Sequence, residues 1–174
     1  GYVQNHEAAK LIIENILPEV EKTIPDIKLK IIGRNPKPEL YKLAENKNNI
    51  LITGEVENTT KELQSANLMV CPIYVSAGLQ NKILEAMSIG LPIITTKQVA
   101  LPITTNEEIL PQADKIEEWT KKIIKICEDD DCRNKISERA LNFVKENFTW
   151  DSYINNLAEF LNNCIEKEVA DDTL

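Results

Sequence analysis

One short stretch, GLQNKILE, has residue types and spacing suited to holding a ligand. Gly78 closes a polar loop, and a helical period begins at Leu79. That period directs Gln80, Lys82 and Glu85 away from the apolar stripe of the helix. Because the first turn of a helix presents free N–H groups and the positive end of the helix dipole, it binds anions readily. The stretch therefore predicts a ligand site at the start of a helix.

The elements around this stretch form a predicted βαβ unit. An apolar run over residues 68–73 is typical of a buried parallel strand, and a second run over 91–94 has Pro92 near its first position, where a missing N–H is tolerated. Gly90 ends the helix between them. The loop after the first strand and the first helical turn then face the crevice where open α/β sheets bind ligands. The predicted apolar stripe of the helix consists of Leu79, Ile83, Ala86 and Met87.

Three glycines, Gly33, Gly54 and Gly78, come just after predicted strands. Loops that follow successive parallel strands lie along one edge of the sheet, so together they favour a ligand-binding edge. The alternative is that each glycine only makes a turn.

The N-terminal part predicts a helix with Asn5 as its N-cap, then strands over 27–32 and 50–53 with a short helix over 38–45 between them. A doubly wound domain normally has a strand ahead of its first helix, and none is present here. We therefore expect the sequence to start just after that strand or to keep only its last residues. The predicted buried stripe of the first helix is Ala8, Ala9, Ile12, Ile13, Ile16, Leu17 and Val20.

Beyond residue 96 the pattern predicts a short strand at Ile109–Leu110 and helices over 115–127 and 132–147. The acidic run at 128–131 suits an N-cap and a favourable charge for the second helix, with a metal site as the alternative. A last helix is predicted from Trp150, followed by a polar tail. Its apolar face consists of Trp150, Tyr153, Ile154, Leu157, Phe160, Leu161, Cys164 and Ile165.

Composition narrows the possible functions. The 174 residues can bury one core, so we expect one domain over residues 1–168 and a tail over 169–174. A net charge of −8 argues against nucleic acid, and the apolar runs are too short for a transmembrane segment. The four cysteines lack CxxC spacing, which favours reduced thiols in a cytoplasmic protein over a zinc site. They are Cys71, Cys127, Cys132 and Cys164.

The run GLQNKILEAM at 78–87, followed by Gly90 and LPIITT, resembles the donor-binding signature of the group 1 glycosyltransferases, which have the GT-B architecture. Weaker resemblances occur in the family's order along most of the chain. They are GYVQN at 1–5, IIG at 31–33, TGEV at 53–56 and FTW at 148–150. The resemblance implies a Rossmann-like, doubly wound parallel sheet with C-terminal helices, one half of a GT-B fold.

The resemblance also implies roles for residues near the signature. Glu85 matches the second glutamate of the family's E-x7-E motif, which binds the donor ribose; a carboxylate accepts two hydrogen bonds from a cis diol. Ala77 stands where the first glutamate would be, which puts the sugar identity in doubt. N–H groups of Gly78, Leu79 and Gln80 would meet the diphosphate or the sugar.

Three further positions have implied roles. Lys82 would add charge for the diphosphate, with a solvent-facing lysine as the alternative. The loop from Gly54 to Val56 would read the base, and Arg34 would order a phosphate or a loop unless it is a plain surface arginine.

The function implied is the donor-binding C-terminal half of a retaining glycosyltransferase, of hexosyltransferase type and inactive alone. Its donor would be a UDP-, GDP- or ADP-linked sugar, its partner an acceptor-binding N-terminal domain, and it would need no metal or cofactor. One alternative is a nucleotide-sugar epimerase, which the single histidine, His6, weakly disfavours. Another is a response-regulator-like module, which the strand ending in Thr53-Gly54 disfavours.

In this family the closing helix often packs on the N-terminal domain. We therefore expect Trp150 and the first turns of that helix to be docked on the core, and the part from about Phe160 onward to be exposed.

Overall fold

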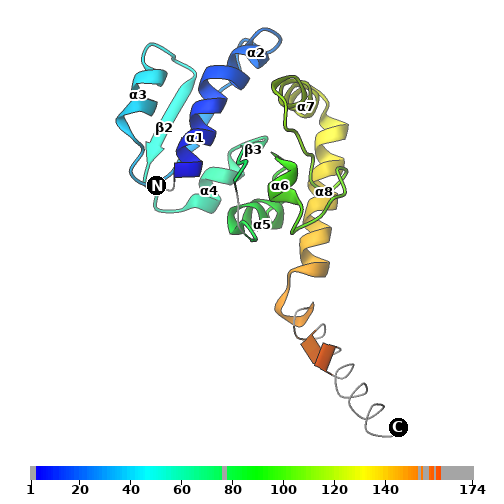
Figure 1. Ribbon diagram of the computed structural model, residues 1–174. Helices are drawn as coiled ribbons and strands as arrows, with labels where there is room; N and C mark the ends of the chain where they lie inside the picture. Colours follow the sequence, from blue (N-terminus) through cyan, green and yellow to red (C-terminus); the bar gives the residue numbers. More distant parts are fainter. Residues whose placement is uncertain (1–2, 76–77, 153, 155–156, 159, 162–174) are drawn as a thin grey trace, which may run out of the picture.

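The computed structural model describes residues 3–75, 78–152, 154, 157–158 and 160–161 and has an α/β architecture with parallel strands and C-terminal helices (Figure 1). This confirms the predicted fold class. In chain order, the elements are α1 (Val3–Leu11), η1 (Ile12–Ile16), α2 (Leu17–Glu21), β1 (Leu29–Ile32), α3 (Pro38–Ala44), β2 (Ile50–Gly54), α4 (Thr59–Gln64), β3 (Met69–Cys71), α5 (Asn81–Ser88), β4 (Ile93–Thr95), α6 (Lys97–Ala100), α7 (Ile116–Glu128) and α8 (Asp130–Asn147).

The first three helical elements follow one another directly, with the π-helical turn η1 between α1 and α2. Their predicted apolar stripe is confirmed: all its members are buried except Ile12, which is half-buried. The predicted N-cap is wrong, because α1 already begins at Val3 and Asn5 lies inside it. The Asn5 side chain accepts a hydrogen bond from Lys82 instead, and this tertiary contact has no local sequence signal.

The strands form two parallel pairs, β1 with β2 and β3 with β4. Strand β4 also meets the chain at Gln112 through an isolated bridge, in which Thr95 N–H donates to the Pro111 carbonyl at 3.0 Å. The predicted strand at 109–110 is therefore misplaced by about two residues. The N–H of Leu110 bonds back to Asn106, so the chain is still turning there.

The continuous helical segment formed by α1, η1 and α2 packs on both pairs of strands. Ile13 belongs to an apolar cluster that includes Leu29 and Ile31 of β1, whereas Ile16 packs in a second cluster with Val70 of β3 and Ile94 of β4. The opposite side of β3 and β4 is covered by α5, α6 and α8, with Ile83 and Met87 fully buried. The sheets are thus joined by apolar contacts to a shared helix.

Helices α7 and α8 are adjacent and are separated by a single capping residue. The Asp129 carboxylate accepts a hydrogen bond from the Cys132 N–H at 2.9 Å, which confirms the N-cap interpretation of the acidic run. Trp119 of α7 is fully buried against the β4 side of the core. Within the described ranges, no helix is both long and apolar enough to span a membrane.

The described residues after α8, which end at 161, lie away from the two pairs of strands (Figure 1). Trp150 is 81% exposed, so the expectation that it docks on the core is wrong. Phe160 is 63% exposed, as expected for the later part of this segment. Tyr153, Cys164, Ile165 and the predicted tail lie outside the described residues.

Candidate functional site

The predicted site lies where α5 begins, just beyond the carboxyl end of β3. Gly78 has φ +69°, a left-handed conformation that favours glycine, and the space where a side chain would project is open. Gln80 is extended and occupies the N-cap position, so α5 begins at Asn81. The helix therefore starts two residues later than predicted. Leu79 lies outside the helix and is 46% exposed, which corrects its assignment to the buried stripe.

The later helix start changes which N–H groups face a ligand. The first N–H groups of a helix have no partner within it, and Ile83 N–H already bonds to the Gln80 carbonyl. The groups best placed to receive an anion are thus those at the start of α5, around Asn81 and Lys82. Gly78 and Leu79 lie in the loop that leads into this helix start.

Lys82 is held at this helix start and does not simply project into solvent. Its Nζ donates a hydrogen bond to Asn5 Oδ1 at 2.7 Å, which connects α5 to α1. The same amino group lies close to the thiol of Cys71 at the end of β3. Burial raises the pKa of that thiol, while Lys82 and Thr95 act in the opposite direction. A cation is therefore held where β3, α5 and α1 meet.

Glu85 is an exposed residue on α5, one turn beyond Lys82, while Ile83, Ala86 and Met87 fill the buried face. The helix ends at Gly90, which has φ +71°. The Leu91 N–H bonds to the Ala86 carbonyl at 3.0 Å, the pattern of a Schellman C-cap. Both ends of α5 are thus fixed, and Glu85 is displayed on its free side.

The other predicted donor-site residues lie at or just after the ends of β1 and β2. Gly54 ends β2 with φ +70° and open space beside it, and Val56 borders a shallow pocket formed by residues 56–58 and 61–62. Arg34 follows β1; its Nε lies 3.7 Å from Glu55 Oε1, and its side chain is 75% exposed. The structure therefore places Arg34 beside the Gly54 loop, after the β1–β2 pair, whereas Glu85 lies on α5, the helix between β3 and β4. Ala77 lies outside the described residues.

Several contacts near the site have no signal in the sequence. Tyr74, in the loop after β3, donates its hydroxyl hydrogen bond to the Asp114 carbonyl at 2.8 Å and accepts one from Trp119 Nε1 at 3.2 Å. These bonds attach the loop to the start of α7. Together with Asn5, Tyr74 is a residue that the sequence pattern missed, because its partners are distant along the chain.

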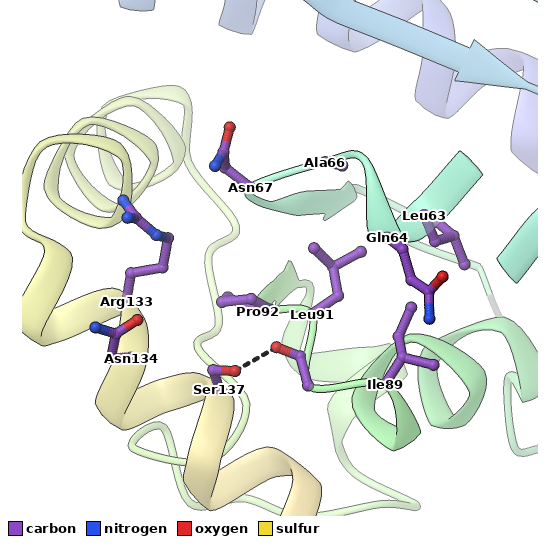
Figure 2. A pocket seen from close by; sticks show the side chains of 11 residues that line it. Leu63, Gln64, Ala66, Asn67, Ile89, Leu91, Pro92, Arg133, Asn134 and Ser137 are labelled. Carbon is purple, nitrogen blue, oxygen red and sulfur yellow. Dashed lines mark hydrogen bonds between the residues drawn. The ribbon is translucent and has the colours of Figure 1, made fainter. Parts of the chain in front are cut away.

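A second pocket lies at the amino ends of β3 and β4, opposite the ends where the predicted site lies (Figure 2). Asn67 and Pro92, which precede these strands, line it, and Ser137 of α8 donates a hydrogen bond to the Gly90 carbonyl there. Arg133 also borders this pocket, but it bonds to Asp130 and to carbonyls at the end of α7. The pocket is therefore separate from the site at the carboxyl ends of the strands.

This chain belongs to the group 1 glycosyltransferase family. The family model described as "Glycosyl transferases group 1" matches residues 1–129, which include both sheets and the start of α5. The chain is 32% identical over 150 residues to the uncharacterized glycosyltransferase MJ1069 of Methanocaldococcus jannaschii. The match covers 79% of this chain and 38% of that protein, so the chain spans less than half the length of this relative.

Solved structures show the same fold at lower identity. The C-terminal domain of the group 1 glycosyltransferase LpcC from Francisella tularensis has a TM-score of 0.64 at 20% identity, covering 84% of this chain and 79% of that one. TarM of S. aureus has a TM-score of 0.73 at 20% identity, covering 88% of this chain and 32% of that one. Anabaena Alr3699/HepE has a TM-score of 0.73 at 16% identity, covering 90% and 46%. The fold is that of a GT-B C-terminal domain.

Proposed function

We propose that this chain is the donor-binding domain of a retaining glycosyltransferase that transfers a sugar from a nucleotide diphosphate to an acceptor hydroxyl. The observation that carries the proposal is the start of α5, where free N–H groups and the Lys82 ammonium meet at the carboxyl end of β3. Such a position suits a diphosphate. Family membership supports it, and the TarM and HepE structures named above are complexes with UDP.

The roles follow from the chemistry of each group. The N–H groups at the start of α5 and the Lys82 ammonium stabilise the negative charge that grows on the diphosphate as the glycosidic bond breaks. Glu85, one turn further on, accepts hydrogen bonds from the ribose hydroxyls. The Gly54–Val56 loop contacts the base, and Arg34 orders that loop through Glu55. Lys82 reaches the diphosphate by exchanging its bond to Asn5 for a phosphate oxygen.

The acceptor site belongs to another part of the protein in this proposal. Reaction in a cleft requires donor and acceptor to be held together in the right geometry, and the described residues supply the donor wall. The chain alone therefore binds donor nucleotide without transferring sugar. The exposed apolar residues after α8, among them Leu157 and Phe160, are available to pack on that other part.

Titration calorimetry with UDP, GDP and ADP tests this function. We expect the chain to bind at least one of these nucleotides in the micromolar to millimolar range, since a half-site lacks the contacts of the closed cleft. Uridine, which lacks phosphates, serves as the matched ligand control and should bind more weakly than UDP. No heat of binding for any of the three diphosphates at millimolar concentration would contradict the proposal.

A further inference from the structure

Lys82 carries a positive charge at a place in the fold that disfavours one. It is the second residue of α5, and the first turn of this helix contains no acidic side chain. Because the N-terminal end of a helix is the positive end of its dipole, a cation there is destabilising unless an anion accompanies it. Lys82 is nevertheless half-buried. Other groups must therefore hold its ammonium at this helix start.

The groups that contact the Lys82 ammonium are neutral. Asn5 Oδ1 accepts its hydrogen bond at 2.7 Å, and another neighbour is the thiol of Cys71, which stays protonated because burial raises its pKa. The ammonium of Lys10 differs, because it pairs with the Glu39 carboxylate at 2.6 Å. None of the ion pairs between described residues includes Lys82. The charge of Lys82 is thus held in place without being neutralised.

The position of Asn5 is fixed by the residue that follows it. His6 is buried, and its Nε2 lies 3.0 Å from Glu39 Oε2 at the start of α3. Glu39 also accepts the hydrogen bond from Lys10, one turn further along α1. These contacts attach the first turns of α1 to α3. Asn5 therefore presents its side-chain amide to α5 from a fixed backbone, although Asn5 itself is exposed.

A neutral amide at position 5 suits a lysine that exchanges its partner for a ligand. Asn5 is the third residue of α1, where a carboxylate would stabilise the helix through its dipole. A carboxylate there would also form an ion pair with Lys82, and the ammonium would have to leave that pair to bond a phosphate. The amide stabilises the fold less than an acid would. It leaves the ammonium with its full charge.

We propose that Asn5 is a positioning residue for the nucleotide diphosphate: it holds the Lys82 ammonium at the start of α5, with its charge uncompensated, where a phosphate oxygen can bond to it. The inference rests on the proposed donor-binding function and adds a residue of α1 to that site. When the ligand binds, the ammonium transfers its hydrogen bond from Asn5 Oδ1 to a phosphate oxygen. Because Asn5 is exposed, water then hydrates its side-chain oxygen, and the exchange leaves no buried polar group without a partner.

A purely structural role for the Asn5–Lys82 hydrogen bond has different consequences. If the contact only joined α1 to α5, a stronger contact would leave ligand binding unchanged. Asn5→Asp supplies such a contact, since the new carboxylate pairs with Lys82 and is favourable in the first turn of α1. In the positioning role, the same substitution neutralises the ammonium and puts a negative charge beside the phosphates. Only the positioning role therefore predicts a loss of affinity without a loss of stability.

Thermal unfolding and calorimetry of Asn5→Asp test the proposal. The ligands are inorganic pyrophosphate, which carries the diphosphate group without a nucleoside, and the nucleotide that the chain binds best among UDP, GDP and ADP. We expect a Tm at or above that of the unchanged chain, together with at least about tenfold weaker binding of both ligands.

Two further variants separate the causes. Asn134→Asp, at an exposed position of α8, adds the same charge far from α5 along the chain and should bind both ligands as the unchanged chain does. Asn5→Ala removes the group that holds Lys82 without adding a charge. It should weaken binding, but less than Asn5→Asp does.

Three results would overturn the proposal. The first is an unchanged affinity of Asn5→Asp, which would make the contact purely structural. The second is equal weakening by Asn5→Asp and Asn134→Asp, which would reflect net charge alone. The third is a lowered Tm of Asn5→Asp, which would show that position 5 does not face an uncompensated cation.

Failure of the proposed function gives a different result. In that case none of the three nucleotides binds the unchanged chain, and the comparison with pyrophosphate alone decides the role of Asn5. If pyrophosphate did not bind either, both the donor site and the role of Asn5 would be wrong.

Discussion

Glu85 is the residue whose proposed role is most directly testable, because it is exposed and its side chain is not part of the core. We predict that Glu85→Gln weakens binding of the diphosphate that the chain prefers among UDP, GDP and ADP by about 10- to 150-fold, since losing a charge-assisted hydrogen bond costs about 1.5–3 kcal/mol. Calorimetry measures the affinity, and thermal unfolding should give an unchanged Tm. Glu138→Gln on α8, also exposed, is the matched control. Equal affinities of Glu85→Gln and the unchanged chain would make Glu85 a plain surface acid.

Glu39 provides a second test at the residue scale, this time of stability. Its hydrogen bond from Lys10, at 2.6 Å, and then the one to His6 hold the pKa of Glu39 below its ordinary value of 4.5. A carboxyl with a lowered folded-state pKa stabilises the fold above its unfolded pKa, and the gain disappears as pH falls through the folded value. We predict that Glu39→Gln lowers Tm near neutral pH and that the difference from the unchanged chain vanishes at pH values well below 4.5.

The control for this prediction is Glu19→Gln, which breaks an exposed pair between α2 and its own C-cap residue, Lys22. Its effect on Tm should be smaller, because it disconnects no two elements. A Tm difference for Glu39→Gln that stayed constant down to pH 2 would show that the loss is not electrostatic.

At the scale of elements, the sequence predicted helices and strands well where the hydrophobic periodicity continued over many residues. The stripe of the first helix, the βαβ unit and the capped start of α8 are all confirmed. Errors fell where tertiary contacts decide the outcome. Asn5 has the residue type of an N-cap, but it lies within α1 and bonds to Lys82, 77 positions away along the chain. Trp150 has the type of a core residue, but its side chain is 81% exposed.

The end of α5 gives a prediction for an element boundary. Gly90 has φ +71°, and a Cβ built there would lie 3.0 Å from Ser137 Oγ of α8. We predict that Gly90→Ala destabilises the fold by about 1–2 kcal/mol, from the left-handed conformation alone. Gly33→Ala is the matched control, because nothing lies within 4 Å of its added Cβ and its φ is outside the left-handed range. Chemical denaturation measures both; equal midpoints would contradict this account of the helix end.

At the scale of the whole molecule, the sequence could predict which residues follow strands but not how the strands are grouped. Gly54 and Gly78 were expected on one ligand-binding edge, but Gly54 ends β2 of one pair of strands and Gly78 lies in the loop after β3 of the other pair. Strand pairing is made by main-chain hydrogen bonds, and the side-chain pattern of the sequence does not show which strands form them. The family resemblance supplied the fold class, whereas the grouping of the described strands into two pairs emerged only from the structure.

This separation leads to the last prediction, which rests on the proposed function. The base-contacting loop at Gly54–Val56 and the diphosphate-contacting start of α5 follow strands of different pairs, which pack on the same helical segment from α1 to α2. A nucleotide that contacts both must span them, so removal of its second phosphate removes contacts at the start of α5 and leaves those at the loop. We therefore predict that the nucleoside monophosphate binds at least about tenfold more weakly than the diphosphate that the chain binds best. Calorimetry with both nucleotides gives the ratio. Equal affinities would show that the diphosphate does not reach the start of α5.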